Sequence, residues 1–391
     1  MDLTDADQLT VDVARVPGNV SERSHNIFMI ETSLISLNIC LALAGFCTNL
    51  VNLVVFILMG IKDAMVVTLF SLSVSDFITT VFALIKLVSF LVGLVCNRLN
   101  IRISIDSLAL FLYFSSWESV FYDISAFTTA FIAVERSLCV CMPFQFKKFV
   151  TWRKNTKAVI IIYVLALAAY SPWLSILRLR SAFDPILNRS IIIYKHATNH
   201  QEQINVFTVH LFLLVLVPLC TFVVIISSGI MAVGLIRSYK FQKMQMRAVS
   251  RQRNSTVRAS SRWSTKLQNA EDEEEEGQVT KLGAGRQQLS SKNFRIIQMV
   301  TIVSALGLAC NVVRFGCVLY VIAFSVDFDD NDTDRQNILT LIMHTFNLIN
   351  VTFNSVVYYN YISTYKAIVR QIFRPRNSVS PNSNISYIKG E

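Results

Sequence analysis

The sequence predicts an all-α membrane protein: a seven-transmembrane helix bundle with a short amphipathic helix after span 7. The first observation is composition, because 53% of the 391 residues are hydrophobic and only 16% are charged. Soluble proteins are typically about 25% charged. The second is a series of apolar runs that each reach the roughly 20 residues needed to cross a bilayer as a helix. These runs do not alternate polar with apolar residues, which excludes the strands of a membrane barrel.

The apolar runs divide the chain into spans and loops. Only helices and closed barrels satisfy their backbone hydrogen bonds in lipid, so each run is predicted to form one helix. Residues 29–236 hold the first five spans, residues 237–295 form a cytoplasmic loop 3 that is disordered between its helical ends, and residues 296–360 hold the last two spans. The predicted spans are 29–59, 66–95, 106–134, 157–177, 205–236, 296–324 and 336–360.

The distribution of Lys and Arg predicts the orientation. With the N-terminus outside, 25 of the 36 Lys and Arg residues fall on the cytoplasmic side and nine on the outer side. Basic residues gather in the cytoplasmic loops of membrane proteins. We therefore expect a multi-pass protein of the plasma membrane with residues 1–28 as an extracellular tail. The net charge of +10 then needs no nucleic-acid partner.

Several surface features follow from this orientation. Residues 361–391 are predicted to form an amphipathic helix on the inner membrane surface and a cytoplasmic tail. Residues 178–204, an outer loop, contain no cysteine, so we expect no outer disulfide. N-glycosylation sequons on the predicted outer side begin at Asn19, Asn188 and Asn331.

A few motifs interrupt the apolar runs with polar residues, and such positions in a membrane span are functional candidates. Span 1 contains Gly45-Phe-Cys-Thr-Asn49, span 2 contains Leu72-Ser-Val-Ser-Asp76, and span 3 ends in Glu135-Arg136-Ser137. Pro143-Phe144 follows span 3, and span 7 contains Asn354-Ser-Val-Val-Tyr358. In this order the motifs resemble the rhodopsin-like family of G-protein-coupled receptors. Within it, the chain is most similar to invertebrate chemosensory-type orphan receptors.

The sequence departs from this family in span 6. It reads Ala309-Cys310-Asn311-Val312-Val313 where many members have Cys-Trp-x-Pro. Asn311 therefore stands where the tryptophan would be, and neither the proline kink nor the tryptophan switch is expected. Span 3 also ends in Glu-Arg-Ser in place of the family's Asp-Arg-Tyr.

The resemblance implies a receptor that binds an extracellular ligand and activates a heterotrimeric G protein. The ligand would be a peptide, an amine or a small chemosensory molecule, and arrestin and kinases would be further partners. Contact between Glu135 and Arg136 would hold the inner face of the bundle closed until activation releases Arg136. The residues assigned to this coupling and latch are Glu135, Arg136, Pro143, Phe144 and Tyr358.

The resemblance also implies a ligand pocket in the outer half of the bundle. Glu118 precedes Arg136 by five helical turns, at a height where an acid in this family commonly meets a cationic nitrogen of the ligand. Glu118 either pairs with Arg314 as an internal lock, or the two bind opposite ends of a zwitterion or peptide. The predicted ligand-binding residues are Glu118, Tyr122, His210, Arg314 and His344.

Asp76 lies in the middle of span 2, where a carboxylate needs a partner, a cation or a proton. By resemblance, an allosteric sodium ion would be held by Asp76 together with Ser125, Asn350 and Asn354. The alternative is a neutral, hydrogen-bonded Asp76. No other cofactor is required.

An alternative class is a seven-span transporter or channel. Such proteins favour helices interrupted by Gly and Pro, and internal repeats. The chain has only 12 Gly and 7 Pro and no repeat, which argues against this class. An enzyme is not predicted, because no nucleophile–base or metal-ligand spacing was found.

Overall fold

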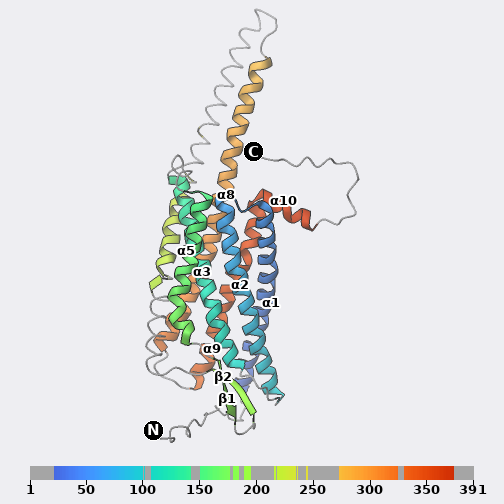
Figure 1. Cartoon of the computed structure of the whole chain (residues 1–391), viewed down its shortest axis with the longest axis vertical. Helices are drawn as coiled ribbons and strands as arrows, with labels where there is room; N and C mark the ends of the chain where they lie inside the picture. Colours follow the sequence, from blue (N-terminus) through green and yellow to red (C-terminus); the bar gives the residue numbers. More distant parts are fainter. Residues whose placement is uncertain are drawn as a thin grey trace, which may run out of the picture.

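Long helices packed side by side form the protein, as the apolar runs predicted. A computed structural model describes residues 22–99, 101, 107–141, 150–176, 179–184, 189–194, 215–216, 218–234, 236, 244, 273–324 and 330–373. Six long helices run along the bundle axis: α1 (Glu22–Met59), α2 (Ala64–Arg98), α3 (Ser107–Cys141), α5 (Trp152–Ile176), α8 (Glu273–Phe324) and α9 (Asp330–Tyr361) (Figure 1). The predicted all-α membrane bundle is confirmed.

Five of the described helices are long and apolar enough to cross a membrane. They lie in α1, α2, α3, α5 and α8. The predicted fifth span is described only as the shorter apolar helix Pro218–Gly234. The predicted seventh span lies in α9, which opens with the charged stretch Asp330-Asn-Asp-Thr-Asp-Arg335 and is less apolar. The count of seven spans therefore stays a prediction, while a multi-pass membrane protein is shown.

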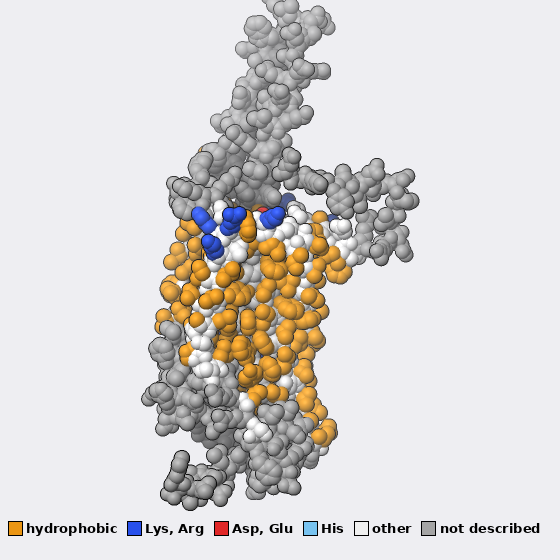
Figure 2. Space-filling model, viewed as in Figure 1, with side chains coloured by type: hydrophobic (Ala, Val, Ile, Leu, Met, Phe, Trp, Pro, Cys, Tyr) orange, Lys and Arg blue, Asp and Glu red, His pale blue; other side chains and the backbone are white. Residues whose placement is uncertain are grey.

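The bundle exposes apolar side chains along its flank, as a lipid environment requires. Figure 2 shows hydrophobic side chains over the length of the bundle and Lys and Arg gathered near one end. On α5, the side chains of Ile160, Val164 and Leu165 are more than half exposed. The opposite face of the same helix is buried, for example at Ala166 and Tyr170. Many polar and charged side chains are instead buried between the helices of the bundle.

A β-hairpin lies at the end of the bundle opposite α10 (Figure 1). Its strands are β1 (Leu179–Asp184) and β2 (Arg189–Tyr194), which pair antiparallel. No strand was predicted in this loop, although the run Ile191-Ile-Ile193 is β-branched and favours an extended chain. The eight cysteines of the chain are all free thiols.

The predicted amphipathic helix is present as α10 (Ser363–Ile372) and lies across the end of the bundle (Figure 1). Tyr365 anchors it, because its buried hydroxyl donates to Asn52 Oδ1 of α1 over 2.5 Å. Burial raises the pKa of Tyr365 to about 12, so the phenol keeps its proton and remains a donor. Phe373 at the other end is 67% exposed and available to lipid.

Helix α8 begins inside the predicted loop 3. We expected residues 237–295 to be disordered between helical ends, and α8 forms one such end, which begins at Glu273 and extends beyond the bundle (Figure 1). The segment that it adds is rich in Glu, Gln, Lys and Arg, which are good helix formers. The other boundaries proposed for the chain's domains stay predictions.

Close packing of α1 against its neighbours depends on Gly45. A Cβ atom on Gly45 would lie 2.7 Å from Thr352 Oγ1 of α9 and 2.7 Å from Thr80 Cγ2 of α2. Asn49, one turn along, donates to the carbonyls of Gly45 and Val351 over 3.0 Å each. The first motif of the sequence therefore joins α1 to α2 and α9.

We predict that Gly45→Ala destabilises the bundle. Overpacking typically costs about 1–3 kcal/mol, which exceeds the gain of up to about 1 kcal/mol in helix propensity from Gly to Ala. The matched control is Gly316→Ala, because a Cβ at Gly316 meets no described atom within 4 Å. Thermal unfolding of the purified proteins should show a lower midpoint for Gly45→Ala alone. Equal midpoints for the two variants would contradict the packing described here.

Candidate functional site

A buried ion-pair cluster joins α2, α3 and α9 inside the bundle. Glu118 of α3 forms an ion pair with Lys86 of α2. His344 of α9 contacts both residues, with its Nδ1 3.3 Å from Glu118 Oε1, and with its Nδ1 and Nε2 2.8 and 2.9 Å from Lys86 Nζ. All three side chains are at most 2% exposed. Lys86 faces inward because its helix turns the apolar side chains of Ile85 and Val88 outward. We call these three residues the Lys86 cluster.

A second buried ion pair joins α3 to α8, and a tyrosine of α5 hydrogen-bonds to it. Arg314 Nη1 of α8 lies 2.5 Å from Asp123 Oδ1 of α3. The hydroxyl of Tyr170 on α5 donates to the other oxygen of Asp123. Arg314 also lies over the ring of Tyr122, with its guanidinium carbon 4.8 Å from the ring centroid. We call Asp123, Arg314 and Tyr170 the Arg314 cluster.

Neutral side chains connect the Arg314 cluster to α9. The Tyr122 hydroxyl donates to Asn311 Oδ1 of α8 over 3.1 Å. Asn350 of α9 donates to the same hydroxyl over 3.4 Å. Asn311 therefore makes a polar contact between α3 and α8. Tyr122 contacts charged and neutral groups from two other helices.

Asp76 is the centre of a polar site in the middle of the bundle. Ser125 donates to its Oδ1 over 2.5 Å and Asn354 donates to its Oδ2 over 2.8 Å. Asn350, the fourth predicted sodium ligand, is directed to Tyr122 instead. Asp76 and Ser125 present oxygens, which are the ligands that hard cations prefer, and in this respect the site fits a sodium ion. The fit is partial, because Asn354 presents its nitrogen to Asp76 and Asn350 contacts Tyr122. Asn354 Oδ1 and Ser73 Oγ are also buried without a hydrogen-bond partner among the described atoms.

The Glu135–Arg136 pair is buried at the α10 end of α3. Arg136 Nη2 lies 2.7 Å from Glu135 Oε1, and the two residues are 8% and 2% exposed. Tyr358, the third described residue that was predicted to take part in coupling, is fully buried. Its ring packs against Phe56 and Tyr365, with centroids 5.4 and 6.0 Å away.

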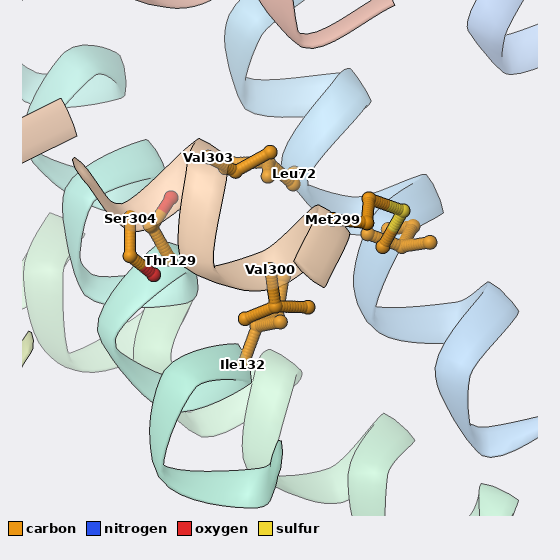
Figure 3. A pocket seen from close by; sticks show the side chains of 8 residues that line it. Leu72, Thr129, Ile132, Met299, Val300, Val303 and Ser304 are labelled. Carbon is orange, nitrogen blue, oxygen red and sulfur yellow. The ribbon is translucent and has the colours of Figure 1, made fainter. Parts of the chain in front are cut away.

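Two cavities lie between these sites, against α3 and α8. One, of about 10 Å³, lies among Met299, Val300 and Val303 of α8 and side chains of α2 and α3 (Figure 3). The other, of about 20 Å³, extends toward Asn311 and Asn350. Both are lined by Thr129 and Ser304. The Ser304 hydroxyl is buried with no hydrogen-bond partner among the described atoms, so the hydrogen-bonding capacity of this part of α8 is not fully used.

The structure changes the predicted pairing of the ligand-site residues. Glu118 pairs with Lys86, whereas Arg314 pairs with Asp123, so the internal lock predicted between Glu118 and Arg314 is wrong. Lys86, Asp123 and Tyr170 were not among the predicted site residues. A charged residue in the middle of an apolar run was the available signal for Lys86 and Asp123.

The remaining predicted residues have these locations. Glu118, Tyr122, Arg314 and His344 all lie in the buried network, as described above. Asn331 lies in the first turn of α9, and its side chain is not described. The predicted residues outside the described part of the chain are His210, Pro143, Phe144, Asn19 and Asn188.

Comparison with known protein families gives a match to a segment that contains two of these helices. Residues 107–254 match the model of the Srg family of chemoreceptors. The matched segment contains α3 and α5 and therefore Glu118, Asp123, Glu135 and Arg136. It confirms the resemblance to chemosensory-type G-protein-coupled receptors, while the rhodopsin-like subclass stays a prediction. No curated protein matches the chain.

We predict that the charges of the receptor couple in the pairs seen in the structure. Removing one member of a buried ion pair leaves an uncompensated charge and typically costs about 3–5 kcal/mol. Glu118→Gln with Lys86→Gln, and Asp123→Asn with Arg314→Gln, should each be milder than the sum of the single changes. The coupling should be about 0.5–3 kcal/mol in each pair. It is measured from thermal unfolding in a double-mutant cycle.

The matched control for these cycles is Glu118→Gln with Arg314→Gln. These residues form no ion pair with each other, so their effects should add to within about 0.5 kcal/mol. Strong coupling in this control, together with additivity between Glu118 and Lys86, would contradict the assigned pairs.

Proposed function

We propose that this chemosensory receptor binds an extracellular ligand inside the bundle and activates a heterotrimeric G protein. It would act in the plasma membrane with its N-terminus outside, and arrestin and kinases would act on its cytoplasmic face. The observation that carries the proposal is the arrangement of α3. This helix holds Glu118 in a buried cluster in its half nearer the hairpin, Asp123 in a second cluster close to its midpoint, and the buried Glu135–Arg136 pair near the α10 end.

The two buried clusters supply a means for a ligand to change the bundle. Charges inside the bundle are compensated by side chains from other helices, so a ligand that replaces one partner weakens a link between helices. Replacement in the Lys86 cluster acts on α2, α3 and α9, and replacement in the Arg314 cluster acts on α3, α5 and α8. A ligand shifts a two-state equilibrium only by its difference in affinity for the two states. Exchange of a buried partner supplies such a difference.

The α10 end of α3 supports a role in G-protein coupling. Separating Glu135 from Arg136 leaves two charges that need new partners, and an incoming protein surface offers them. The cavity of about 10 Å³ lies next to this region, since Ile132 of α3 lines it one turn before Arg136 (Figure 3). A movement of α8 relative to α3 at this point would accompany release of Arg136.

A sodium ion at Asp76 is proposed as an allosteric cofactor. Asp76 and Ser125 would supply oxygens to it, and the Asn354 amide would join them if its oxygen replaced its nitrogen. Nitrogen and oxygen of an amide exchange places by a half-turn of the group. A bound cation would compensate the buried carboxylate and favour the closed arrangement of α2, α3 and α9.

We predict that Arg136→Ala removes signalling and leaves ligand binding largely unchanged. Arg136 is eighteen residues from Glu118, which is about 27 Å along α3 at 1.5 Å per residue. The measurement compares second-messenger responses and ligand binding in cells with equal surface expression. Lys62→Ala is the matched control, because Lys62 is exposed at the same end of the bundle.

Parallel loss of binding and signalling in Arg136→Ala would contradict the role given to Arg136. Ligand-dependent flux across the membrane without any second-messenger response would instead support the transporter or channel alternative.

We predict that sodium stabilises the receptor and that Asp76→Asn removes this effect. Loss of the carboxylate removes the one formal negative charge among the four predicted sodium ligands. Thermal unfolding is compared in sodium and in potassium salts of equal ionic strength. Asp63→Asn, at an exposed aspartate before α2, is the control and should keep the response to sodium. An unchanged response in Asp76→Asn would rule out this site.

A further inference from the structure

We propose that Arg153 and Lys157 of α5 bind the headgroup of one anionic phospholipid, whose acyl chains lie along the exposed apolar side of the same helix. This site goes beyond the proposed function, because it needs a membrane and no signalling partner. In the proposed orientation the α10 end of the bundle is cytoplasmic. The lipid then belongs to the cytoplasmic leaflet, which carries the anionic phospholipids.

Helix α5 is the span most open to lipid among the five described candidates. It buries 11% of its most apolar window, whereas the other four bury 33–50% of theirs. One side is fixed to the bundle: the Asn155 amide donates to the carbonyl of Ala64 on α2 over 3.1 Å, and Tyr170 contacts Asp123 of α3. The other side of α5 therefore offers a surface to lipid along its length.

The basic residues at the start of α5 lie on this open side. At 100° per residue, Arg153, Lys154 and Lys157 fall within about 100° of one another. Their common direction is roughly opposite to that of Asn155 and Val159, which are buried. All three basic side chains are exposed. They therefore extend sideways from the bundle, toward the lipid that surrounds it.

The depth of these residues matches the headgroup layer. Residues 158–176 of α5 are mainly apolar and rise about 27 Å at 1.5 Å per residue, close to the roughly 30 Å of the hydrocarbon core. The charged first turns then lie among the headgroups. Figure 2 shows Lys and Arg side chains directly beyond the hydrophobic flank, at the end where α5 begins.

The same side of α5 continues as an apolar surface below the charges. Ile160 and Val164 follow Lys157 on this side, and both are more than half exposed. From Lys157 to Ile160 the helix rises about 4.5 Å. A phospholipid with its phosphate at Lys157 consequently has its acyl chains against these two side chains. Headgroup and chains thus meet one continuous surface of a single helix.

Trp152 and Arg153 give the site its donors and its position at the membrane boundary. The guanidinium carbon of Arg153 lies 5.6 Å from the centroid of the Trp152 ring, which is 44% exposed. Indole rings favour the level of the headgroups. Stacking uses the face of a guanidinium and leaves the N–H groups at its edge for a phosphate.

The charge of the site selects an anionic headgroup over a zwitterionic one. Among the described residues, neither Arg153 nor Lys157 forms an ion pair. The exposed acid in the turn before α2, Asp63, accepts from the backbone N–H of Met65 over 2.9 Å. A phosphatidylcholine headgroup carries its own cation beside the phosphate. An anionic headgroup brings the net negative charge that the basic side chains of α5 attract.

The test uses the full-length receptor in nanodiscs of phosphatidylcholine that contain a phospholipid with brominated acyl chains. Bromine quenches the fluorescence of a nearby indole, and subtracting the signal of Trp152→Phe isolates the quenching of Trp152. Brominated phosphatidylglycerol is compared with brominated phosphatidylcholine at equal mole fraction. We expect the anionic lipid to bind beside Trp152 at least about fivefold more tightly, the factor typical of one basic residue at an anionic surface. Equal quenching of Trp152 by the two lipids would overturn the inference.

Charge variants separate a site on α5 from the general charge of this end of the bundle. Arg153→Gln with Lys157→Gln should reduce the preference to about one, and Lys157→Arg should keep it. The matched control is Lys62→Gln with Arg370→Gln, which removes two exposed basic residues from the same end and should keep the preference. If the double variant of α5 does not fold, Lys157→Gln alone should lower the preference about fivefold. An equal loss in the control would overturn the site.

A soluble headgroup distinguishes a lipid from a free phosphate. Glycerophosphoglycerol carries the phosphodiester of phosphatidylglycerol without acyl chains, so it should not restore the fluorescence of Trp152 when added at the same concentration as the lipid. Restoration would show that the headgroup alone is bound and would overturn the assignment to a phospholipid. Since no second-messenger response is measured, these results are independent of the proposed receptor function.

Discussion

The arrangement of this bundle depends on the cost of burying charge in a medium of low dielectric. An isolated ion inside the bundle loses several kcal/mol of solvation, which only a closely placed partner can offset. The structure meets this constraint by pairing charges between helices: Lys86 with Glu118, and Arg314 with Asp123. Apolar side chains cover the lipid-facing surface and provide little selectivity between helices, because lipid is as apolar as they are. The ion pairs therefore contribute to the choice of neighbours.

Helix α3 takes part in every one of these polar sites. From the hairpin end to the α10 end it carries Glu118, Asp123, Ser125 and then the pair Glu135–Arg136. A displacement of α3 changes the geometry of all these sites together, since one rigid helix carries them. Coupling between distant sites typically amounts to 1–3 kcal/mol, which is less than the cost of disrupting one buried ion pair. Loss of one ion-pair partner at one end of α3 is thus large enough in free energy to bias the other end.

The sequence predicts the helices well because the signal is local, but it predicts their contacts poorly. Apolar runs of bilayer length located α1, α2, α3, α5 and α8 to within a few residues at most ends. Partner choice failed, because spacing along a helix gives the relative height and direction of its side chains but not which neighbouring helix each of them faces. Glu118 and Asp123 are five residues apart, about 7.5 Å in height and about 140° in direction. They consequently reach different neighbours, and Glu118 meets Lys86 rather than Arg314.

The same reasoning explains why the Asp76 site was predicted more closely than the ligand site. Ser125 and Asn354 were assigned to the Asp76 site by resemblance to a family in which spans 2, 3 and 7 face one another at this height. Both residues contact Asp76 in the structure. Asn350 does not contact Asp76 as predicted, because its amide donates to the hydroxyl of Tyr122. Asn311 explains this exception: it accepts from Tyr122 and so holds the phenol in place for Asn350. Asn311 of α8 is therefore connected, through one hydroxyl group, to the absence of a hydrogen bond between Asn350 and Asp76 among the described residues.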